Sequence, residues 1–368
     1  MSGARSLVAH LPERWARLVA RPTALALALA GTLIGLGLVK YGIQMWPGWR
    51  FLHEIAVNWR HPTQGPLITA PADYLVANAT GSFATGILGL TATPVYVACM
   101  AGLAIAAIAT PFLMPRARRS SDMSRLLFVM LAGGPVLALL LLTIGGYDAI
   151  SVLGLGIAVL ARSHWVAAAG WAVVGFQHSS LGVLAAVMLA VFWVASEGLS
   201  VRARLVPVAV GVLVGASANA LVMLQLGGVT SRLELYLHYP LQHYVDVLIA
   251  GMPLLLFSAL GMGWALLLDP GARRLRATRV LLALAVVTSF LVPLIAEDQS
   301  RMVAMVLYLC VLAWTITVVE SRDGSSMTGR LWSRYAVAAA IVPVVMLYAG
   351  HMVPAGWNAF LAFRSTLG

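Results

Sequence analysis

The chain has 368 residues, of which 61% are hydrophobic and 10% are charged, and its mean hydropathy is +0.90. A soluble globule of this length needs more polar surface, so the composition excludes one and indicates an integral membrane protein. The net charge of +11 does not indicate nucleic-acid binding, because the arginines stand in short clusters between apolar segments of membrane-spanning length. Cys99 and Cys310 both lie inside apolar runs, which predicts neither a disulfide framework nor a thiolate metal site.

In chain order, residues 1–21 form a basic N-terminal segment expected on the cytoplasmic side, and 23–44 form an uncleaved first span. Apolar length then predicts an all-α, polytopic helical bundle of about eleven spans. The remaining spans are placed at 93–114, 125–146, 149–161, 165–177, 180–197, 204–224, 249–269, 279–296, 302–319 and 335–353.

Residues 149–197 need a separate argument, because two of their segments have only 13 residues and reach about 20 Å of a roughly 30 Å hydrocarbon core. A hairpin that turns at Gln177-His178-Ser179-Ser180 places the later arginine clusters on the same side as Arg116 and Arg162. One long helix over 165–197 places them on the opposite side. The excess of Arg in cytoplasmic loops therefore favours the hairpin, with the N-terminus in the cytoplasm.

This topology puts seven of the 13 acidic residues on the outer face. Four outer segments are expected to converge there on one site: the long first loop 46–92 with juxtamembrane helices, the turn 145–148, the loop 225–248, and the turn 296–301. Carboxylates beside fixed arginines suit an anionic, lipid-borne substrate, because Arg grips phosphate and a carboxylate accepts a proton from a hydroxyl. The candidate site residues are Arg50, His53, Glu54, Arg60, Asp73, Asp148, His178, Arg232, His238, Asp298 and Arg301.

Each candidate also has a structural interpretation. Asp298 and Arg301 can pair with each other and cap helix ends. Asp148 follows two glycines and precedes an apolar run, so it is a ready helix N-cap. His178 is more often a satisfied histidine of a bundle than a catalyst, and an aromatic belt explains the neighbours of His238 equally well.

The order of these features resembles the polyprenyl-phosphate-sugar-dependent glycosyltransferases of the GT-C superfamily. In that family an acidic residue on a juxtamembrane helix follows the first span, and Glu54 in RFLHEIAVNWR stands at that place. The family's second acidic residue, between the third and fourth spans, is matched by Asp148 in GGYDAISVLGLG. The resemblance covers residues 23–200 and is positional, and the pair His53-Glu54 stands where many members have an Asp or an Asp-Glu pair.

The resemblance implies an inverting hexosyl- or pentosyltransferase that moves a sugar from a polyprenyl-phosphate donor to a glycan or lipid-linked acceptor at the extracytoplasmic face. Glu54 would be the general base, Asp148 would position the acceptor, and Arg232 with Arg301 would stabilise the leaving phosphate. No cofactor is expected. Some members use a divalent metal with such carboxylates, but the sequence has no tight ligand cluster for one.

The domains expected are a cytoplasmic segment 1–21, a GT-C-like membrane module 22–200, and C-terminal membrane helices 201–368. The composition is typical of a GC-rich bacterial genome and places the chain in a bacterial inner membrane.

Two other functions stay open. A polymerase of O-antigen or exopolysaccharide would depend on the loop 225–248, and more on Arg232 and Arg301 than on Glu54. A transporter or flippase would show charge at mid-membrane depth and an internal repeat.

Overall fold

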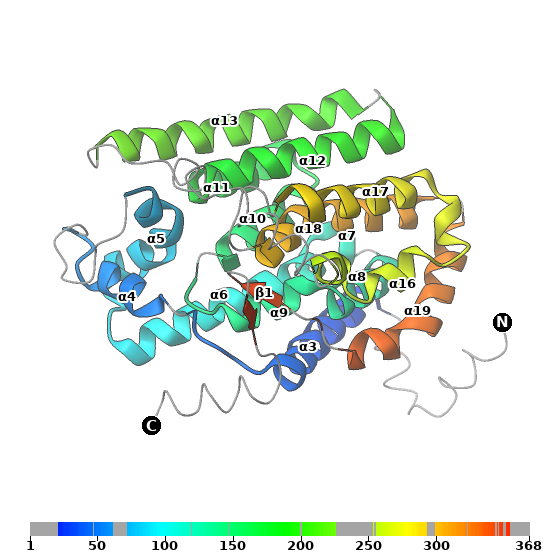
Figure 1. Cartoon of the computed structure of the whole chain (residues 1–368), viewed down its shortest axis with the longest axis horizontal. Helices are drawn as coiled ribbons and strands as arrows, with labels where there is room; N and C mark the ends of the chain where they lie inside the picture. The colour runs from blue at the N-terminus through cyan, green and yellow to red at the C-terminus, as the bar shows by residue number, and fades with distance from the viewer. Residues whose placement is uncertain are drawn as a thin grey trace.

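The computed structural model describes residues 21–353, apart from 47, 62–71, 119, 147, 199–200, 226–252, 254, 293–298, 322, 343, 345 and 349–350. The described part is a bundle of helices with one short β-hairpin, arranged as Figure 1 shows. Its elements are α3 (Pro22–Tyr41), α4 (Trp49–Val57), α5 (Ala72–Ile87), α6 (Thr93–Leu113), α7 (Pro115–Arg118), α8 (Ser121–Gly133), α9 (Pro135–Leu142), α10 (Asp148–Leu160), α11 (His164–Gln177), α12 (Ser179–Glu197), α13 (Arg202–Gln225), α16 (Gly263–Leu267), the 3₁₀ helix η2 (Ala272–Arg274), α17 (Arg276–Leu291), α18 (Gln299–Glu320), α19 (Gly324–Ile341), β1 (Met346–Tyr348) and β2 (His351–Val353).

Several of these helices have the length and composition of membrane spans. Within the described residues, five helices are long and apolar enough to cross a bilayer: α3, α6, α12, α13 and α18. A sixth span follows if α8 and α9, which bend by 63° at their junction, are counted together. The chain is therefore a multi-pass membrane protein, as the composition predicts.

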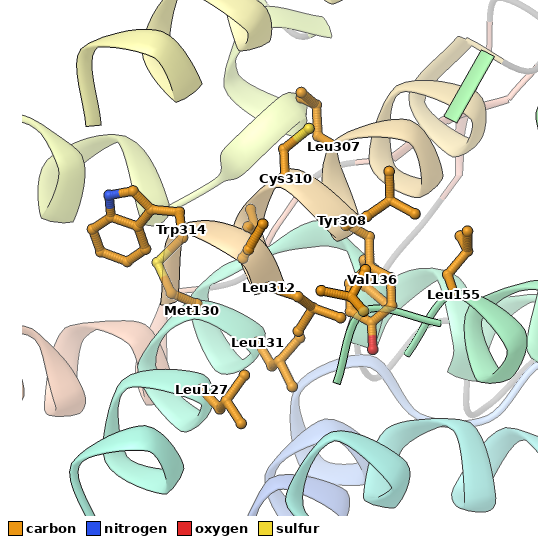
Figure 2. Close-up of a cluster of buried hydrophobic side chains, with 14 of the residues drawn as sticks. Leu127, Met130, Leu131, Val136, Leu155, Leu307, Tyr308, Cys310, Leu312 and Trp314 are labelled. Carbon is orange, nitrogen blue, oxygen red and sulfur yellow. The ribbon is translucent and has the colours of Figure 1, made fainter. Parts of the chain in front are cut away.

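Helix α18 forms the centre of the bundle. Almost all of its side chains from Ser300 to Thr315 are buried, whereas α3, α12 and α13 leave most of their apolar surface outside the protein. Figure 2 shows Leu307, Tyr308 and Trp314 of α18 packed among side chains of α8, α9 and α10. At one polar point of this core, Trp314 Nε1 donates a hydrogen bond to Thr278 Oγ1 of α17 at 2.8 Å. One helix thus holds segments that are far apart in the sequence.

The helices α10, α11 and α13 pack through small residues. A Cβ atom added to Gly215 of α13 would lie 2.2 Å from the carbonyl oxygen of Ala172 in α11, and one on Gly170 would lie 2.7 Å from that of Gly154 in α10. Such contacts require glycine, because any side chain would collide with the neighbouring backbone. Helices α10 and α11 are shorter than a bilayer is thick, and close backbone contacts pack them together with α13.

The predicted turn at 177–180 is confirmed. Helix α11 ends at Gln177, His178 is extended with φ −157°, and α12 begins at Ser179. The α12 helix then folds back on α11, since a Cβ on Gly182 would lie only 3.0 Å from Cα of Gly175. The structure thus has the hairpin that the distribution of arginines favours.

Three predicted spans need correction. In the described part of the segment 249–269 the helix is interrupted at Gly261, whose φ is +54°, and α16 begins only at Gly263. The segment 125–146 is not straight: it breaks at Gly134-Pro135, where proline has no N–H for the preceding turn. The segment 335–353 is not one helix, because α19 ends at Ile341 and an antiparallel β-hairpin follows. Val342 is extended, with ψ 120°, as expected for a residue before proline.

The breaks leave backbone carbonyls without helical partners, and Lys40 binds two of them. Its Nζ donates to Ala132 O at 2.8 Å and to Ala339 O at 2.9 Å. In a regular helix the second carbonyl would accept from residue 343, which is proline and has no N–H. The amide of Met262 donates to Gly133 O at 2.8 Å at the same bend. Lys40 therefore joins the first span to α8 and α19.

A buried aspartate secures the connection between α16 and α17. Asp269 is 2% exposed, and its carboxylate accepts from the amide of Gly271 at 2.9 Å and from Arg334 Nη1 at 3.0 Å, with Arg330 Nη2 at 3.4 Å. Desolvation raises the pKa of Asp269, but the Gly271 amide and the two guanidinium groups outweigh it, so the pKa is lowered. Asp269 thus holds α19 against the α16–α17 connection as a carboxylate.

Candidate functional site

The segments that follow α3 and α9 are paired in a strand-like manner. The amide of Trp46 donates to Ile144 O at 2.7 Å, and the amide of Ile144 donates to Gln44 O at 3.1 Å. The turn that follows needs glycine, since Gly145 has φ +82° and a Cβ there would lie 3.3 Å from Cβ of Trp49. The start of loop 46–92 and the turn 145–148 therefore meet, as predicted, and α4 begins against that turn.

Asp148 and Arg301 form a buried ion pair between two helix starts. Asp148 is the first residue of α10 and Arg301 is in the first turn of α18, and their side chains are only 1% and 4% exposed. Arg301 Nε lies 3.7 Å from Asp148 Oδ1, and Thr143 Oγ1 donates to Asp148 Oδ2 at 2.9 Å. Three of the four segments expected to converge are thus joined here, with Arg301 contributed by a segment about 150 residues further along the chain.

Helix α4 brings Glu54 and His53 to the same end of the bundle. Glu54 lies five residues beyond Trp49, about 7.5 Å along the helix, and its Oε2 atom is buried. His53 Nε2 donates to Thr91 O at 2.7 Å, and its ring lies 4.9 Å from that of Tyr96. The hydroxyl of Tyr96 in turn lies 3.0 Å from Ser82 Oγ of α5. His53 is therefore a residue that fixes α4 against α5 and α6.

The second helix of the loop completes this end of the bundle. A Cβ on Gly81 of α5 would lie 3.3 Å from the side chain of Ile150 in α10, and one on Gly86 would lie 2.4 Å from the carbonyl oxygen of Ala56 in α4. Helix α5 thus packs against both the start of α10 and the end of α4. The backbone of Asp73 belongs to α5, and its side chain lies outside the described residues.

Two of the predicted arginines lie on the surface of α4 and just beyond it. Arg50 and Arg60 are exposed, and their guanidinium groups lie 5.8 Å and 5.2 Å from the rings of Trp49 and Trp59. Such cation–π contacts at the end of membrane helices are typical of the interface between lipid and water. These two arginines are therefore placed to meet lipid phosphates, and Glu54 lies between them.

His178 lies at the Asp148 end of α10, because α10 and α11 run antiparallel and pack through Gly154 and Gly170. Its Nδ1 accepts from the amide of Leu181 at 3.2 Å and lies 3.0 Å from Ser180 Oγ. The histidine thus serves as the N-cap of α12, which is its structural interpretation. Arg232, His238 and Asp298 lie outside the described residues.

The sequence does not predict the ion pair itself. It indicates Asp148 and Arg301 as separate candidates and pairs Arg301 with its sequence neighbours, because only the packing of α10 against α18 shows the contact. The sequence analysis does not include Thr143 among the candidates. Thr143 precedes Asp148 by five residues across a double-glycine turn, and such a turn brings the two side chains back together. This spacing is the sequence feature that could have indicated Thr143.

The arrangement supplies a half-buried carboxylate, Glu54, on the helix that begins against the turn leading to a second carboxylate, Asp148, which Arg301 holds. Arg301 and the hydroxyl of Thr143 hold the carboxylate of Asp148 in place, so Asp148 is suited to orient a hydroxyl or a cation. Among the described residues, no group of three or more His, Cys, Asp and Glu side chains is placed to hold a metal ion. Comparison with known protein families, with curated proteins and with solved structures found no match to this chain.

Proposed function

We propose that the chain is a membrane glycosyltransferase of the GT-C type, which transfers a sugar from a polyprenyl phosphate to a glycan or lipid-linked acceptor. The observation that carries the proposal is that α4, which bears Glu54, begins against the turn that leads into the buried Asp148–Arg301 pair. Both acidic positions of the resemblance thus belong to one end of the bundle. The proposal includes about eleven spans, an N-terminus in the cytoplasm, and a site on the outer face of a bacterial inner membrane.

In the proposed reaction an acceptor hydroxyl attacks the anomeric carbon while the bond from that carbon to the phosphate oxygen breaks. Glu54 takes the hydroxyl proton, and the polyprenyl phosphate leaves with the bonding electrons. Asp148 positions the acceptor and holds the guanidinium of Arg301 in place. Arg301, with Arg232 and the exposed Arg50 and Arg60, offers positive charge to the phosphate.

The test is transfer of a labelled sugar in reconstituted membranes, from polyprenyl-phosphate donors extracted from the native host. Glu54→Gln should abolish transfer, and Asp148→Asn should reduce it at least about 100-fold, because general-base and positioning groups contribute about that much. The matched control is Asp122→Asn, a half-exposed carboxylate of α8 paired with Arg125. It should keep full activity.

Thermal unfolding and size-exclusion profiles of each variant separate lost chemistry from lost folding. Full transfer by a folded Glu54→Gln protein would overturn its role as base. If no donor is used and undecorated lipid-linked repeats accumulate in a deletion strain, the polymerase replaces the transferase. In that case Arg232→Ala should be more damaging than Glu54→Gln.

A transporter is the second candidate, and one observation favours it. Arg301 is only 3% exposed at the start of a candidate span, and Lys40 lies near the end of another. Charges in such places often mark substrate or ion pathways. Uptake of labelled polyprenyl-phosphate sugars into protein-containing vesicles without transfer to any acceptor would decide for transport.

A further inference from the structure

A charged pocket lies at the end of α10 opposite to Asp148. It is a cavity of about 70 Å³ beside the turn from α10 to α11, and it is lined by the starts of α11 and α13, the end of α12 and part of α18. Asp148 and the pocket residue Val159 are separated by eleven residues of α10, about 16 Å along the helix. The pocket is therefore separate from the proposed catalytic site.

Positive charge dominates the lining. Arg116, Arg162 and Arg204 line the pocket with the carboxylate of Glu197, and the carboxylate of Glu320 acts on Arg116 from nearby, so three cations against two anions leave a surplus of one positive charge before His164 is counted. Glu197 is already bound to Arg204, whose Nη1 lies 2.9 Å from Oε2 and 3.2 Å from Oε1. A pocket with this balance attracts an anion.

Arg116 is half-buried, whereas Arg162 and Arg204 are exposed. Burial lowers the pKa of Arg116, the carboxylate of Glu320 opposes that effect, and repulsion from Arg204 and Arg162 adds to it. A half-buried guanidinium beside two groups of like charge is stabilised when an anion binds among them. A phosphate accepts several charge-assisted hydrogen bonds from such groups at once.

The surroundings indicate where that phosphate comes from. The pocket opens at the ends of α12 and α13, and both helices expose valines along their length, among them Val191 and Val210. Trp165 lies one residue beyond the pocket residue His164 and is 82% exposed, as an aromatic anchor at a membrane interface would be. A headgroup in the pocket can therefore leave its acyl chains on an apolar helix surface.

We propose that the Arg116–Arg162–Arg204 pocket binds the phosphate headgroup of an anionic membrane lipid. Basic pockets between membrane helices on the cytoplasmic side are suited to such headgroups, and the arginine-rich end of this bundle is the one that the positive-inside rule assigns to the cytoplasm. The bound lipid would hold α7, the α10–α11 turn and the α12–α13 connection together. The inference does not depend on the reaction proposed for the Asp148 end.

The experiment measures lipid-dependent thermal stability of the full chain in neutral detergent. Dioleoylphosphatidylglycerol, dioleoylphosphatidylcholine and inorganic phosphate are titrated separately, and the apparent Kd is taken from the rise in unfolding temperature. We expect phosphatidylglycerol to stabilise the wild type and phosphatidylcholine to have no comparable effect. The double substitution Arg116→Gln with Arg162→Gln should weaken phosphatidylglycerol binding at least about tenfold.

Two further variants test whether binding depends on the charges inside the pocket. Arg118→Gln removes the same charge from the exposed surface of α7, two residues from Arg116, and should leave the apparent Kd unchanged within about twofold. Glu197→Gln removes the competing carboxylate from Arg204 and should tighten binding several-fold. This gain cannot arise from a folding defect.

The outcomes separate the possible ligands. Stabilisation by phosphatidylglycerol that depends on Arg116 and Arg162 supports the lipid site. Equal stabilisation by inorganic phosphate with the same dependence supports the anion pocket but assigns it to a free phosphate. The proposal is overturned if no anion stabilises the protein, or if the double variant binds phosphatidylglycerol as tightly as the wild type and Arg118→Gln do.

Discussion

The buried pair Asp148–Arg301 makes a quantitative prediction through a double-mutant cycle. At 3.7 Å and an effective dielectric constant of about 20, the attraction of the two charges is about 4.5 kcal/mol. Asp148→Asn and Arg301→Gln should each reduce the free energy of unfolding by about 3–5 kcal/mol, because each leaves a buried charge without its partner. The double variant should cost much less than the sum, with a coupling energy of about 3 kcal/mol or more.

The chain provides a matched control for this cycle. Asp122 and Arg125 are also 3.7 Å apart, but their side chains are 20% and 36% exposed. The same cycle on this pair should give a coupling energy below about 1 kcal/mol, since solvent screens the charges. Unfolding in mixed micelles with increasing dodecyl sulfate, followed by tryptophan fluorescence, measures all variants. Equal coupling energies for the two pairs would refute the argument that burial strengthens Asp148–Arg301.

Three further predictions concern the scaffold. Asp269→Asn should lower the free energy of unfolding at pH 7. Because the folded-state pKa of Asp269 is lowered, this difference should be complete above about pH 5 and shrink progressively as the pH falls below about 4 towards the folded-state pKa. A difference that does not shrink at all as the pH falls from 5 to the acid unfolding of the protein would contradict this reasoning. Gly215→Ala should reduce the free energy of unfolding by about 1–3 kcal/mol, because its Cβ would lie 2.2 Å from a backbone oxygen. Gly102 has open space at its Cβ, so Gly102→Ala should be neutral or stabilising in the same unfolding assay. Lys40→Met should cost about 1–3 kcal/mol by leaving the carbonyls of Ala132 and Ala339 without their donor, and unchanged stability would show that water or lipid replaces it.

Much of the helical scaffold can be predicted from apolar length. The expected spans 23–44, 93–114 and 204–224 correspond to α3, α6 and α13, since continuous apolar runs of this length have few other solutions in a membrane. The sequence also contains a signal for the bend at Pro135 and for the end of α19 before Pro343, because proline has no N–H. A prediction from apolar composition alone does not use this signal.

The site could be predicted only in part, for a physical reason. The turn 145–148 and the first loop could be brought together, because both follow predicted spans on one side of the membrane. The partner of Asp148 could not, because apolar length and charge bias say nothing about which helices are neighbours. From the sequence, the arginines of the pocket indicate only which side of the membrane they lie on. Arg116, Arg162 and Arg204 are far apart in the sequence, and packing alone brings them together.

The contacts of Lys40 have a consequence for biogenesis. The lysine is in α3, but one of its two acceptors, Ala339, is 299 residues further along the chain. Until α19 is synthesised and inserted, the ammonium group near the end of α3 must stay hydrated or in contact with headgroups. The first helix therefore takes its final position late, and a ribosome-bound chain that ends before α19 should leave Lys40 accessible to amine-reactive reagents that the finished protein excludes.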